Sequence, residues 1–518
     1  MLKRRYLFVF SSGILFSVPF IFPEFNILSF FSGIPFFMIL FDDIINNKNN
    51  TNNKIFKYTF VFGMSFYLPV YIWFLWMYPM EQTGVTPLQS ACIVVAAWFG
   101  FPLMQTFVLL MLPFGLRICK KLYIKNIFVL PLTAACFYVI TEWAQSWFMS
   151  GLTWAKLSIS QYKDLFFIQS VSLFGTYFAS FVIIFINAAI ALYILNKNNF
   201  LILSVILLYF MNSYFGYFRI MYYDYIEKTS ERTKITAQIM QGNIPSYEKW
   251  EVAGYDNSMK VYESLLENYV DETVDICVFP ETSVPVSITQ NGRVYNRLLD
   301  LAKKYDITLF AGTFYVDGDK EYNANMAFDK NYDFIQPYGK RHLVPFGEYL
   351  PADKILRELI PFVSNMALFD SVLTPGEGSD IMTVNGINYG GLICFDSIFP
   401  ELARISVKNG ADILIVVTND SWFRDSPAIY QHNAQAVLRA VENNRYVVRA
   451  ANTGISTFIS NTGKILQKSQ ILEREVLTED IYVVKNKTIY TVCGDIILYL
   501  SFSYVAFCFG RRIKINKK

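Results

Sequence analysis

The pattern of hydrophobic and polar positions changes abruptly near residue 225. Before that point, long apolar runs follow one another, and about 20 apolar residues in a helix cross the ~30 Å apolar core of a membrane. After it, short apolar runs typical of strands alternate with amphipathic stretches typical of helices. The pattern predicts a membrane domain in residues 1–225 and a polar domain in residues 226–487.

Several apolar runs are candidate transmembrane helices. We place them at residues 6–22, 27–41, 58–78, 89–116, 126–149, 165–195, 200–222 and 488–510. The first run follows three basic residues and fits a signal peptide as well as a span. No small-residue cleavage site precedes Pro23, so we expect an uncleaved span. Residues 488–518 then form a C-terminal transmembrane helix with a basic tail.

Lysine and arginine concentrate on alternate connecting segments of this pattern. They lie at 3–5, 48–57, 117–125, 197 and 511–518, whereas the short loops at 23–26 and 79–88 contain none. Because basic loops favour the cytoplasmic side, both termini are predicted to be cytoplasmic. Residues 226–487 are then predicted to lie outside the membrane, in the periplasm beyond a bacterial inner membrane or on an equivalent external face.

Composition agrees with this division. The 518 residues are 53% hydrophobic and 17% charged, whereas soluble domains average about 25% charged residues. Residues 1–225 hold only 14 of the 45 Lys and Arg and 7 of the 42 Asp and Glu. A disordered chain and a disulfide scaffold are excluded, and no basic run has the interleaved aromatic residues that a nucleic-acid groove needs.

One carboxylate, Glu142, lies within an apolar run of the membrane domain. A carboxylate inside a membrane is costly and is often functional. The alternative is that Glu142 lies near the external end of its span and reaches water by snorkelling. The sequence leaves both interpretations open.

The polar domain shows alternating strand and helix patterns. Strands are predicted at 234–240, 275–280, 307–315, 324–329, 382–394, 412–418, 446–450 and 455–460. Helices are predicted at 250–269, 292–304, 398–409 and 427–443. This alternation predicts one α/β domain whose strands are covered by helices.

Three polar side chains follow strand-like runs and form a possible nucleophilic set: Glu281, Lys340 and Cys394. Thiol attack requires a base that takes the proton, and a fixed cation stabilises the oxyanion that forms on a carbonyl. Spacing alone leaves plainer interpretations open. A cysteine at the end of a strand is often a small buried hydrophobe, and charges there are common at the surface.

The residues around these positions resemble the nitrilase, or carbon–nitrogen hydrolase, superfamily. The motifs are Pro280-Glu281-Thr-Ser-Val-Pro, Lys340-Arg-His-Leu-Val-Pro-Phe-Gly-Glu348-Tyr and Gly-Leu-Ile-Cys394-Phe-Asp. With several spans before them and one after, the whole chain resembles the apolipoprotein N-acyltransferase family. Further matching segments are Gly151-Leu-Thr-Trp154, Gln241-Gly242-Asn243-Ile244-Pro245, Lys249-Trp250, Asn419-Asp420-Ser421-Trp422-Phe423, Gln431-His432 and Arg449-Ala-Ala-Asn452-Thr-Gly454.

The resemblance implies an α-β-β-α sandwich and assigns roles at the matching positions. Glu281 is expected to be the general base, Lys340 the oxyanion stabiliser and Cys394 the nucleophile. Supporting and substrate-binding roles are expected for Glu348, Asp396, Trp250, Phe395 and Trp422.

Three positions depart from the pattern of the family. Phe395 and Asp396 stand where Tyr and Glu are usual, and Arg424 stands where Gly is typical. The first two place the fit of the lipid or peptide in doubt. At Arg424 the loop has a different turn, or the side chain meets a lipid phosphate, or it is simply solvated.

The resemblance further implies an enzyme that moves a fatty acyl chain from a phospholipid, through a cysteine thioester, to an apolipoprotein. The acceptor is the N-terminal amine of diacylglyceryl-cysteine, and the lipid bilayer is a partner. A membrane-anchored nitrilase-type amidohydrolase remains the alternative. A transporter with an external binding domain would require repeated halves, which the sequence lacks.

Some expectations concern residues outside this set. No cofactor is expected, and no metal, because the two histidines His342 and His432 lack metal-ligand spacing. Cys277 is expected in the core, without a disulfide to Cys394. The apolar segment 359–376 is expected to be a lid that gates acyl chains, with a core-packed excursion as the alternative.

Overall fold

The computed structural model describes residues 2–46, 53–80, 84–119, 128–147, 151–350, 353, 357–358, 373–378 and 381–516. The chain forms two compact units. The first, which we call the helical unit, comprises Met1–Leu75, Val95–Tyr225 and Cys493–Lys518. The second, the sheet unit, comprises Trp76–Val94 and Ile226–Val492, so it includes a segment from within the predicted membrane domain.

Each apolar run of the sequence contains at least one helix. The elements are α1 (Leu2–Ile21), η1 (Pro23–Phe30), α2 (Ile34–Asn46), α3 (Lys54–Val70), η2 (Ile72–Met77), α4 (Pro87–Leu109), α5 (Met111–Ile118), α7 (Val129–Trp147), η4 (Leu157–Gln161), α8 (Leu165–Ile168), α9 (Val171–Phe174), α10 (Thr176–Asn196), α11 (Asn199–Thr229) and α19 (Ile496–Asn516). The run predicted at 89–116 is divided between α4 and α5, and the run at 165–195 begins with two short helices.

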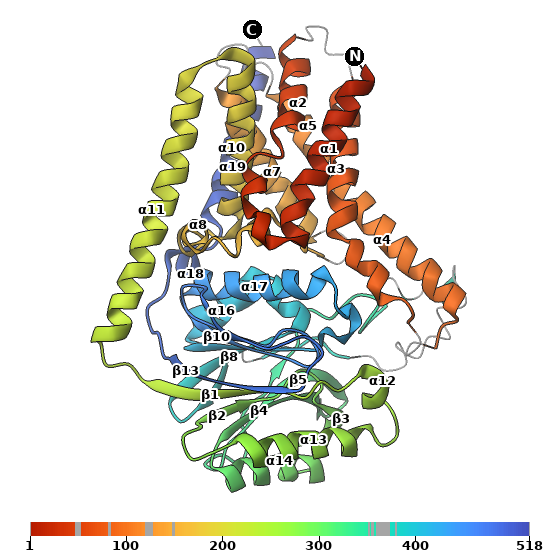
Figure 1. Ribbon diagram of the computed structural model, residues 1–518, viewed down its shortest axis with the longest axis vertical. Coiled ribbons are helices and arrows are strands. Elements are labelled where there is room, and N and C mark those ends of the chain that lie inside the picture. Colours follow the sequence, from red (N-terminus) through yellow and green to blue (C-terminus); the bar gives the residue numbers. More distant parts are fainter. Residues whose placement is uncertain are drawn as a thin grey trace. The chain divides into compact units, whose positions relative to one another are not determined.

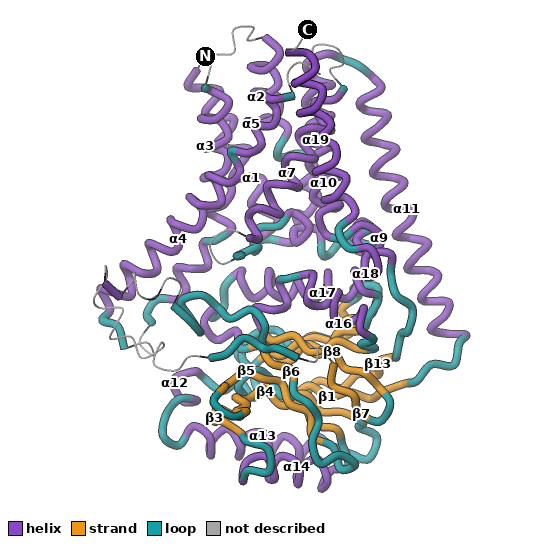
Figure 2. The backbone as a smooth tube through the Cα atoms, turned by 180° about the vertical axis from the view of Figure 1, so that it is seen from behind, coloured by secondary structure: helices purple, strands orange, loops and turns teal. Residues whose placement is uncertain are grey.

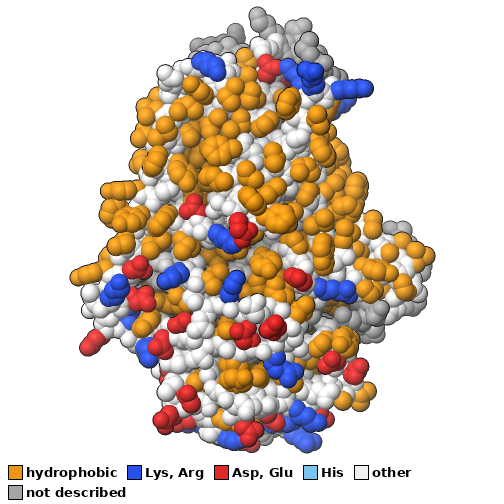
Figure 3. All heavy atoms as spheres, in the orientation of Figure 1, with side chains coloured by type: hydrophobic (Ala, Val, Ile, Leu, Met, Phe, Trp, Pro, Cys, Tyr) orange, Lys and Arg blue, Asp and Glu red, His pale blue; other side chains and the backbone are white. Residues whose placement is uncertain are grey.

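Long apolar helices are the main feature of the helical unit. Among the described residues, four stretches are long and apolar enough to cross a membrane: Pro23–Asn46, Pro87–Ile118, Thr176–Asn196 and Asn199–Thr229. Hydrophobic side chains cover most of this unit on the face drawn in Figure 3. Large apolar surfaces of this kind mark contact with lipid or protein. The predicted region of several apolar helices is therefore confirmed.

Glu142 lies in the interior of the helical unit. Its side chain on α7 is buried, and Oε1 accepts a hydrogen bond of 2.9 Å from the backbone N–H of Leu157, the first residue of η4. The neighbouring Lys156 places its ammonium 4.6 Å from the centre of the Tyr177 ring. The interpretation in which Glu142 snorkels to water is therefore wrong, because its carboxylate holds an internal loop.

The sheet unit contains two β-sheets in the described residues. One has the order β13-β1-β2-β4-β5-β6, with β3 paired to β4, and the other has the order β12-β11-β10-β9-β8-β7. The strands are β1 (Lys234–Gln241), β2 (Ile276–Val278), β3 (Val284–Ile288), β4 (Thr308–Asp317), β5 (Lys320–Phe328), β6 (Tyr338–Gly339), β7 (Ile381–Val384), β8 (Ile387–Ile393), β9 (Ile413–Thr418), β10 (Tyr446–Ala451), β11 (Thr457–Ile459), β12 (Ile465–Lys468) and β13 (Glu475–Tyr482).

The strand predicted at 382–394 is a hairpin of two strands. β7 and β8 pair in antiparallel register around Asn385 and Gly386, whose φ angles are 50° and 78°. Asn-Gly readily adopts the two positive φ angles of a tight hairpin turn. The sequence signal for this turn was present within the run, but the flanking apolar residues obscured it.

Helices cover both outer faces of the paired sheets, as Figures 1 and 2 show. Helices α13 and α14 cover the sheet that contains β1, and α16 and α17 cover the other. The predicted α-β-β-α sandwich is thus confirmed. The helical elements are α12 (Ser246–Lys249), α13 (Gly254–Tyr269), α14 (Arg293–Tyr305), η7 (Cys394–Ile398), α16 (Pro400–Asn409), η8 (Asp420–Phe423), α17 (Pro427–Asn443) and α18 (Ile489–Cys493).

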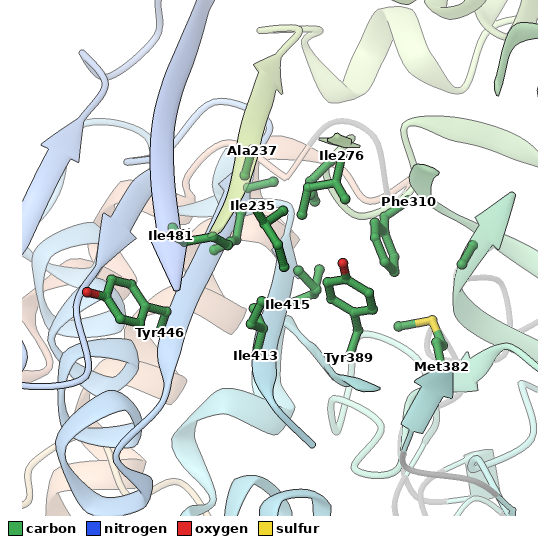
Figure 4. Close-up of a cluster of buried hydrophobic side chains, with 14 of the residues drawn as sticks. Ile235, Ala237, Ile276, Phe310, Met382, Tyr389, Ile413, Ile415, Tyr446 and Ile481 are labelled. Atoms are coloured by element: carbon green, nitrogen blue, oxygen red, sulfur yellow. The ribbon is translucent and has the colours of Figure 1, made fainter. Parts of the chain in front are cut away.

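A core of buried hydrophobic side chains separates the two sheets (Figure 4). Successive side chains of a strand point to opposite faces. Ile239 of β1 therefore joins the core between the sheets, whereas Met240 packs under the helices. Cys277 is fully buried on that helical side, which confirms its prediction as a core residue.

We expect Ile415→Ala to lower the free energy of unfolding by about 2–5 kcal/mol, the cost of truncating a fully buried isoleucine. Ile415 lies on β9 in the core between the sheets. Denaturant unfolding of the detergent-solubilised chain, followed by tryptophan fluorescence, measures the change. The control is Val252→Ala at an exposed position, where we expect a change within about 0.5 kcal/mol. Equal effects of the two substitutions would contradict this view of the core.

Candidate active site

The ammonium group of Lys340 lies between two carboxylates. Its Nζ is 3.1 Å from Oε1 of Glu281 and 2.9 Å from Oε1 of Glu348. The amide of Asn323 donates to the same two oxygens, at 2.9 and 2.8 Å. Lys340 and Glu281 are both buried, so each charge relies on the other for compensation.

Three β-strands position these groups. Glu281 follows β2 after Phe279 and Pro280, Asn323 lies on β5, and Lys340 directly follows β6. The backbone N–H of Lys340 donates to the carbonyl of Asn323 at 2.7 Å. Gly312 of β4 passes so close that an added Cβ would lie 2.5 Å from Cα of Glu281. A glycine at that position lets the carboxylate approach the neighbouring strand.

Opposing effects act on the pKa of Lys340. Burial lowers the pKa of its ammonium group, but the negative charges of Glu281 and Glu348 raise the pKa by more than burial lowers it. The net pKa lies well above the usual range. Lys340 therefore remains a cation. Glu348 also closes the loop that follows, because its Oε2 accepts the backbone N–H of Val344 at 2.8 Å.

Cys394 stands where β8 passes into η7. It is half-buried and has a φ of 48°, a left-handed conformation that costs a residue other than glycine about 1–3 kcal/mol. Burial raises the pKa of the thiol, the charge of Glu281 raises it further, and Lys340 lowers it. The net pKa is raised, so the thiol holds its proton at rest. Glu281, Lys340 and Cys394 thus lie within electrostatic reach of one another.

Asp396 joins the turn of Cys394 to the strand before Lys340. Its carboxylate accepts hydrogen bonds of 2.9 Å from the hydroxyl of Tyr338 and from the backbone N–H of His342. Burial raises the pKa of Asp396, and the N–H of His342 opposes that shift. Although aspartate is one methylene shorter than glutamate, both carboxylate oxygens of Asp396 accept hydrogen bonds from the segment around Lys340.

The three predicted substrate-binding aromatic residues have different surroundings. Phe395 is buried and meets Phe399 edge-on, with ring centres 5.1 Å apart. Trp250 follows α12, is 51% exposed and lies 6.0 Å from the ring of Phe314. Trp422 is half-buried within η8. Only Trp250 presents a large apolar surface to the outside.

Sequence reasoning missed two residues that hold the carboxylate of Glu281. One is Asn323, described above. The other is Asn419, whose backbone N–H donates to Oε2 of Glu281 at 2.8 Å. Asn419 directly follows an apolar run, as Glu281 and Cys394 do, so its position after β9 was an available signal. The sequence thus indicated the position of Asn419 but not its role, because a backbone donor has no side-chain signature.

A second buried lysine lies behind Glu281. The ammonium group of Lys249, at the end of α12, is 3.2 Å from the hydroxyl of Thr282. Burial lowers the pKa of Lys249 to about 8, and the charge of Glu281 opposes that shift. Thr282 has a φ of 49°, so Lys249 supports a left-handed turn directly after Glu281.

Arg424 also has a positive φ, of 47°. The turn thus has a left-handed backbone, which glycine would adopt more readily than arginine. Whether this turn differs from that of the family stays a prediction. The exposed guanidinium is 3.4 Å from the carbonyl of Pro79, within the same unit. A contact of Arg424 with lipid phosphate stays a prediction.

The predicted lid is mostly outside the described residues, since 359–372 are not among them. Its end at 373–376 lies beside the site, where the N–H of Gly376 donates to the carbonyl of Lys340 at 2.7 Å.

In the part of the chain that the structure describes, no group of three or more His, Cys, Asp or Glu is arranged to hold a metal. Each of the seven cysteines lies in the described part of the chain, and none of them forms a disulfide there.

The sequence matches known protein families in both halves of the chain. Residues 236–485 match the model of the carbon-nitrogen hydrolase family, and residues 12–189 match that of the apolipoprotein N-acyltransferase N-terminal domain. The apolipoprotein N-acyltransferase of Geobacter metallireducens is 27% identical, covering 95% of this chain and 92% of that protein. That of Pasteurella multocida is 30% identical, covering 70% of this chain and 71% of that protein.

Among solved structures, the chain is similar to Nit3 of Saccharomyces cerevisiae, a member of branch 10 of the nitrilase superfamily. The identity is 21%, the TM-score is 0.38, and the match covers 48% of this chain and 90% of that one.

We expect alkylation of Cys394 by iodoacetamide to accelerate with pH well beyond pH 8.5, the ordinary pKa of a cysteine. Only the thiolate reacts, and a raised pKa keeps the thiolate fraction small at neutral pH, rising about tenfold per pH unit. Peptide mass spectrometry measures the rate, with exposed Cys493 in the same sample as the reagent control. A rate at Cys394 that levels off below pH 8 would contradict the raised pKa.

Proposed function

The chain belongs to the apolipoprotein N-acyltransferase family, and we propose that it transfers a fatty acyl chain from a phospholipid to the N-terminal amine of a diacylated apolipoprotein. The observation that carries the proposal is the arrangement of Lys340 between Glu281 and Glu348, beside a protonated Cys394 thiol. A carboxylate, a cation and a thiol at one point provide the base, the oxyanion stabiliser and the nucleophile of acyl transfer.

In the first half-reaction, Glu281 takes the proton of the Cys394 thiol as the sulfur attacks the ester carbonyl of the phospholipid. The carbonyl oxygen becomes an oxyanion, which Lys340 and backbone N–H groups stabilise. The carbon–oxygen bond of the ester then breaks, and the departing alkoxide takes the proton from Glu281. A lysophospholipid leaves, and the acyl chain remains on Cys394 as a thioester.

In the second half-reaction, the amine of the diacylglyceryl-cysteine attacks the thioester. Glu281 accepts a proton from the attacking amine, and Lys340 stabilises the second oxyanion. The carbon–sulfur bond breaks, the thiolate recovers a proton, and an amide forms. The reaction is ping-pong, because the first product leaves before the acceptor reacts.

Two charged neighbours keep Lys340 suited to this role. Its raised pKa means that it stays an ammonium throughout, so it donates hydrogen bonds without losing its proton. Glu348 is the second carboxylate in contact with the Lys340 ammonium. We propose that Glu348 and Asp396 support the catalytic residues and that Trp250, Phe395 and Trp422 bind the substrate.

The apolar helices fit substrates that are anchored in a bilayer. A phospholipid and a diacylated protein both hold their reactive groups near the membrane surface, so an enzyme that joins them must work there. We propose that the catalytic domain, residues 226–487, lies in the periplasm and that both termini are cytoplasmic. The membrane domain then comprises residues 1–225, and the C-terminal helix and its tail comprise 488–518.

Incubation of the purified chain with phospholipid carrying a radiolabelled acyl chain tests the proposal. We expect one hydroxylamine-sensitive label per chain on the wild type and none on Cys394→Ala, because only the thiol forms a thioester. Cys493→Ala, at an exposed cysteine, is the matched control and is expected to keep the label. A wild type without label, or label that persists in Cys394→Ala, would overturn the mechanism.

Addition of a diacylglyceryl-cysteine peptide to the labelled chain distinguishes the acyltransferase from an amidohydrolase. We expect the label to move to the peptide as an amide, and to remain on Cys394 when the peptide is absent. Rapid release of free fatty acid without any peptide would instead identify water as the acceptor.

A further inference from the structure

The strained turn at Cys394 is held by a buried histidine. Nε2 of His432 lies 3.1 Å from the carbonyl oxygen of Cys394 and 3.0 Å from the hydroxyl of Ser397. A carbonyl oxygen only accepts hydrogen bonds, so Nε2 carries a proton toward it. The hydroxyl of Ser397 donates to the same carbonyl at 2.7 Å. His432 is fully buried on α17.

A carboxylate fixes the other side of the His432 ring. Nδ1 of His432 is 2.9 Å from Oδ1 of Asp420, and Nη2 of Arg449 donates to Oδ2 at 2.8 Å. All three side chains are fully buried. Burial alone would raise the pKa of Asp420, but the charge of Arg449 and the contact with His432 outweigh it, and the net pKa is lowered.

Asp420 belongs to a run of three residues that contacts Glu281 and lies beside the thiol. The backbone N–H of Asn419 donates to Oε2 of Glu281 at 2.8 Å. The hydroxyl of Thr418 donates to Oδ1 of Asp420 at 3.0 Å. Burial raises the pKa of the Cys394 thiol, and Thr418 is one of the neighbours that oppose this shift. The end of β9 is therefore a single anchor for both the base and the nucleophile.

The packing around this anchor leaves little freedom. An added Cβ at Gly454 would lie 2.3 Å from Oδ2 of Asp420, so the loop after β10 presses directly against the carboxylate. Asn452 donates to the side chain of Asn419 at 3.2 Å and to the carbonyl of Ile244 at 2.7 Å. The anchor is thus braced from the loops that follow both β10 and β1.

We propose that Asp420, His432 and Arg449 form a positioning triad, which fixes the backbone of Cys394 and sets the distance between its thiol and Glu281. None of the three needs to touch a substrate atom. Arg449 orients Asp420, Asp420 orients the ring of His432, and Nε2–H of His432 holds the carbonyl of Cys394. The inference rests on the proposed function, since it concerns the geometry of thioester formation.

Two substitutions of His432 separate this role from a general need for a polar residue. The amide nitrogen of glutamine reaches the place of Nε2, whereas that of asparagine reaches only the place of Nδ1. His432→Gln therefore keeps a donor to Cys394, and His432→Asn keeps only the contact with Asp420. The matched control is Gln435→Leu, one turn further along α17, where the buried Nε2 has no hydrogen-bond partner among the described residues.

The measurement is the single-turnover rate of thioester formation on the full chain in mixed micelles with radiolabelled phosphatidylethanolamine. We expect His432→Gln to stay within about fivefold of the wild type and His432→Asn to be about 100-fold slower, the usual cost of a small misplacement of a reacting group. The donor concentration at half-maximal rate stays unchanged, and Gln435→Leu retains the wild-type rate. Equal rates for His432→Gln and His432→Asn would overturn the inference.

A second readout keeps the triad testable without any lipid. We expect iodoacetamide to alkylate Cys394 more slowly in His432→Asn than in His432→Gln at the same pH, because a displaced thiol loses its contact with the anchor. If the wild type forms no thioester while this difference persists, the proposed function fails and the triad stands. If the wild type forms the thioester and the alkylation rates of both variants equal that of the wild type, only the triad fails.

Discussion

The site depends on one buried ammonium that faces two carboxylates. Without Lys340, Glu281 would be a buried negative charge that has lost the ammonium 3.1 Å from its carboxylate, and such a loss costs roughly 3–5 kcal/mol. Without either carboxylate, burial would favour the neutral amine, which is a poorer stabiliser of an oxyanion. The three groups are therefore coupled. Their mutual compensation permits three charged groups to lie together within the sheet unit.

The sandwich brings these groups together because both sheets send strand ends to the same place. β2 leads to Glu281 and β6 to Lys340 in one sheet, while β8 leads to Cys394 and β9 to Asn419 in the other. The apolar core between the sheets fixes their separation (Figure 4). Hydrogen bonds from Asn419 to Glu281 and from Tyr338 to Asp396 then tie one sheet to the other across the site.

Much of this was predictable from the sequence, for identifiable reasons. Long apolar runs and the positions of Glu281, Lys340 and Cys394 after strand-like segments are properties of the chain itself, and the family resemblance supplied the sandwich. The hairpin at Asn385 was not predicted, because the flanking apolar residues obscured the Asn-Gly turn. The buried position of Glu142 was not predicted, because a local pattern does not reveal a burial partner distant in sequence. Asn323 and the N–H of Asn419 act through contacts between strands, which only the folded chain reveals.

In the proposed mechanism, the acyl chain passes through Cys394 before the acceptor arrives. Rapid-quench measurement of lysophospholipid release in the absence of any acceptor peptide tests this order of events. We expect a burst of one lysophospholipid per chain that then stops, because the first product leaves when the thioester forms. Release that begins only after the acceptor peptide is added would contradict it.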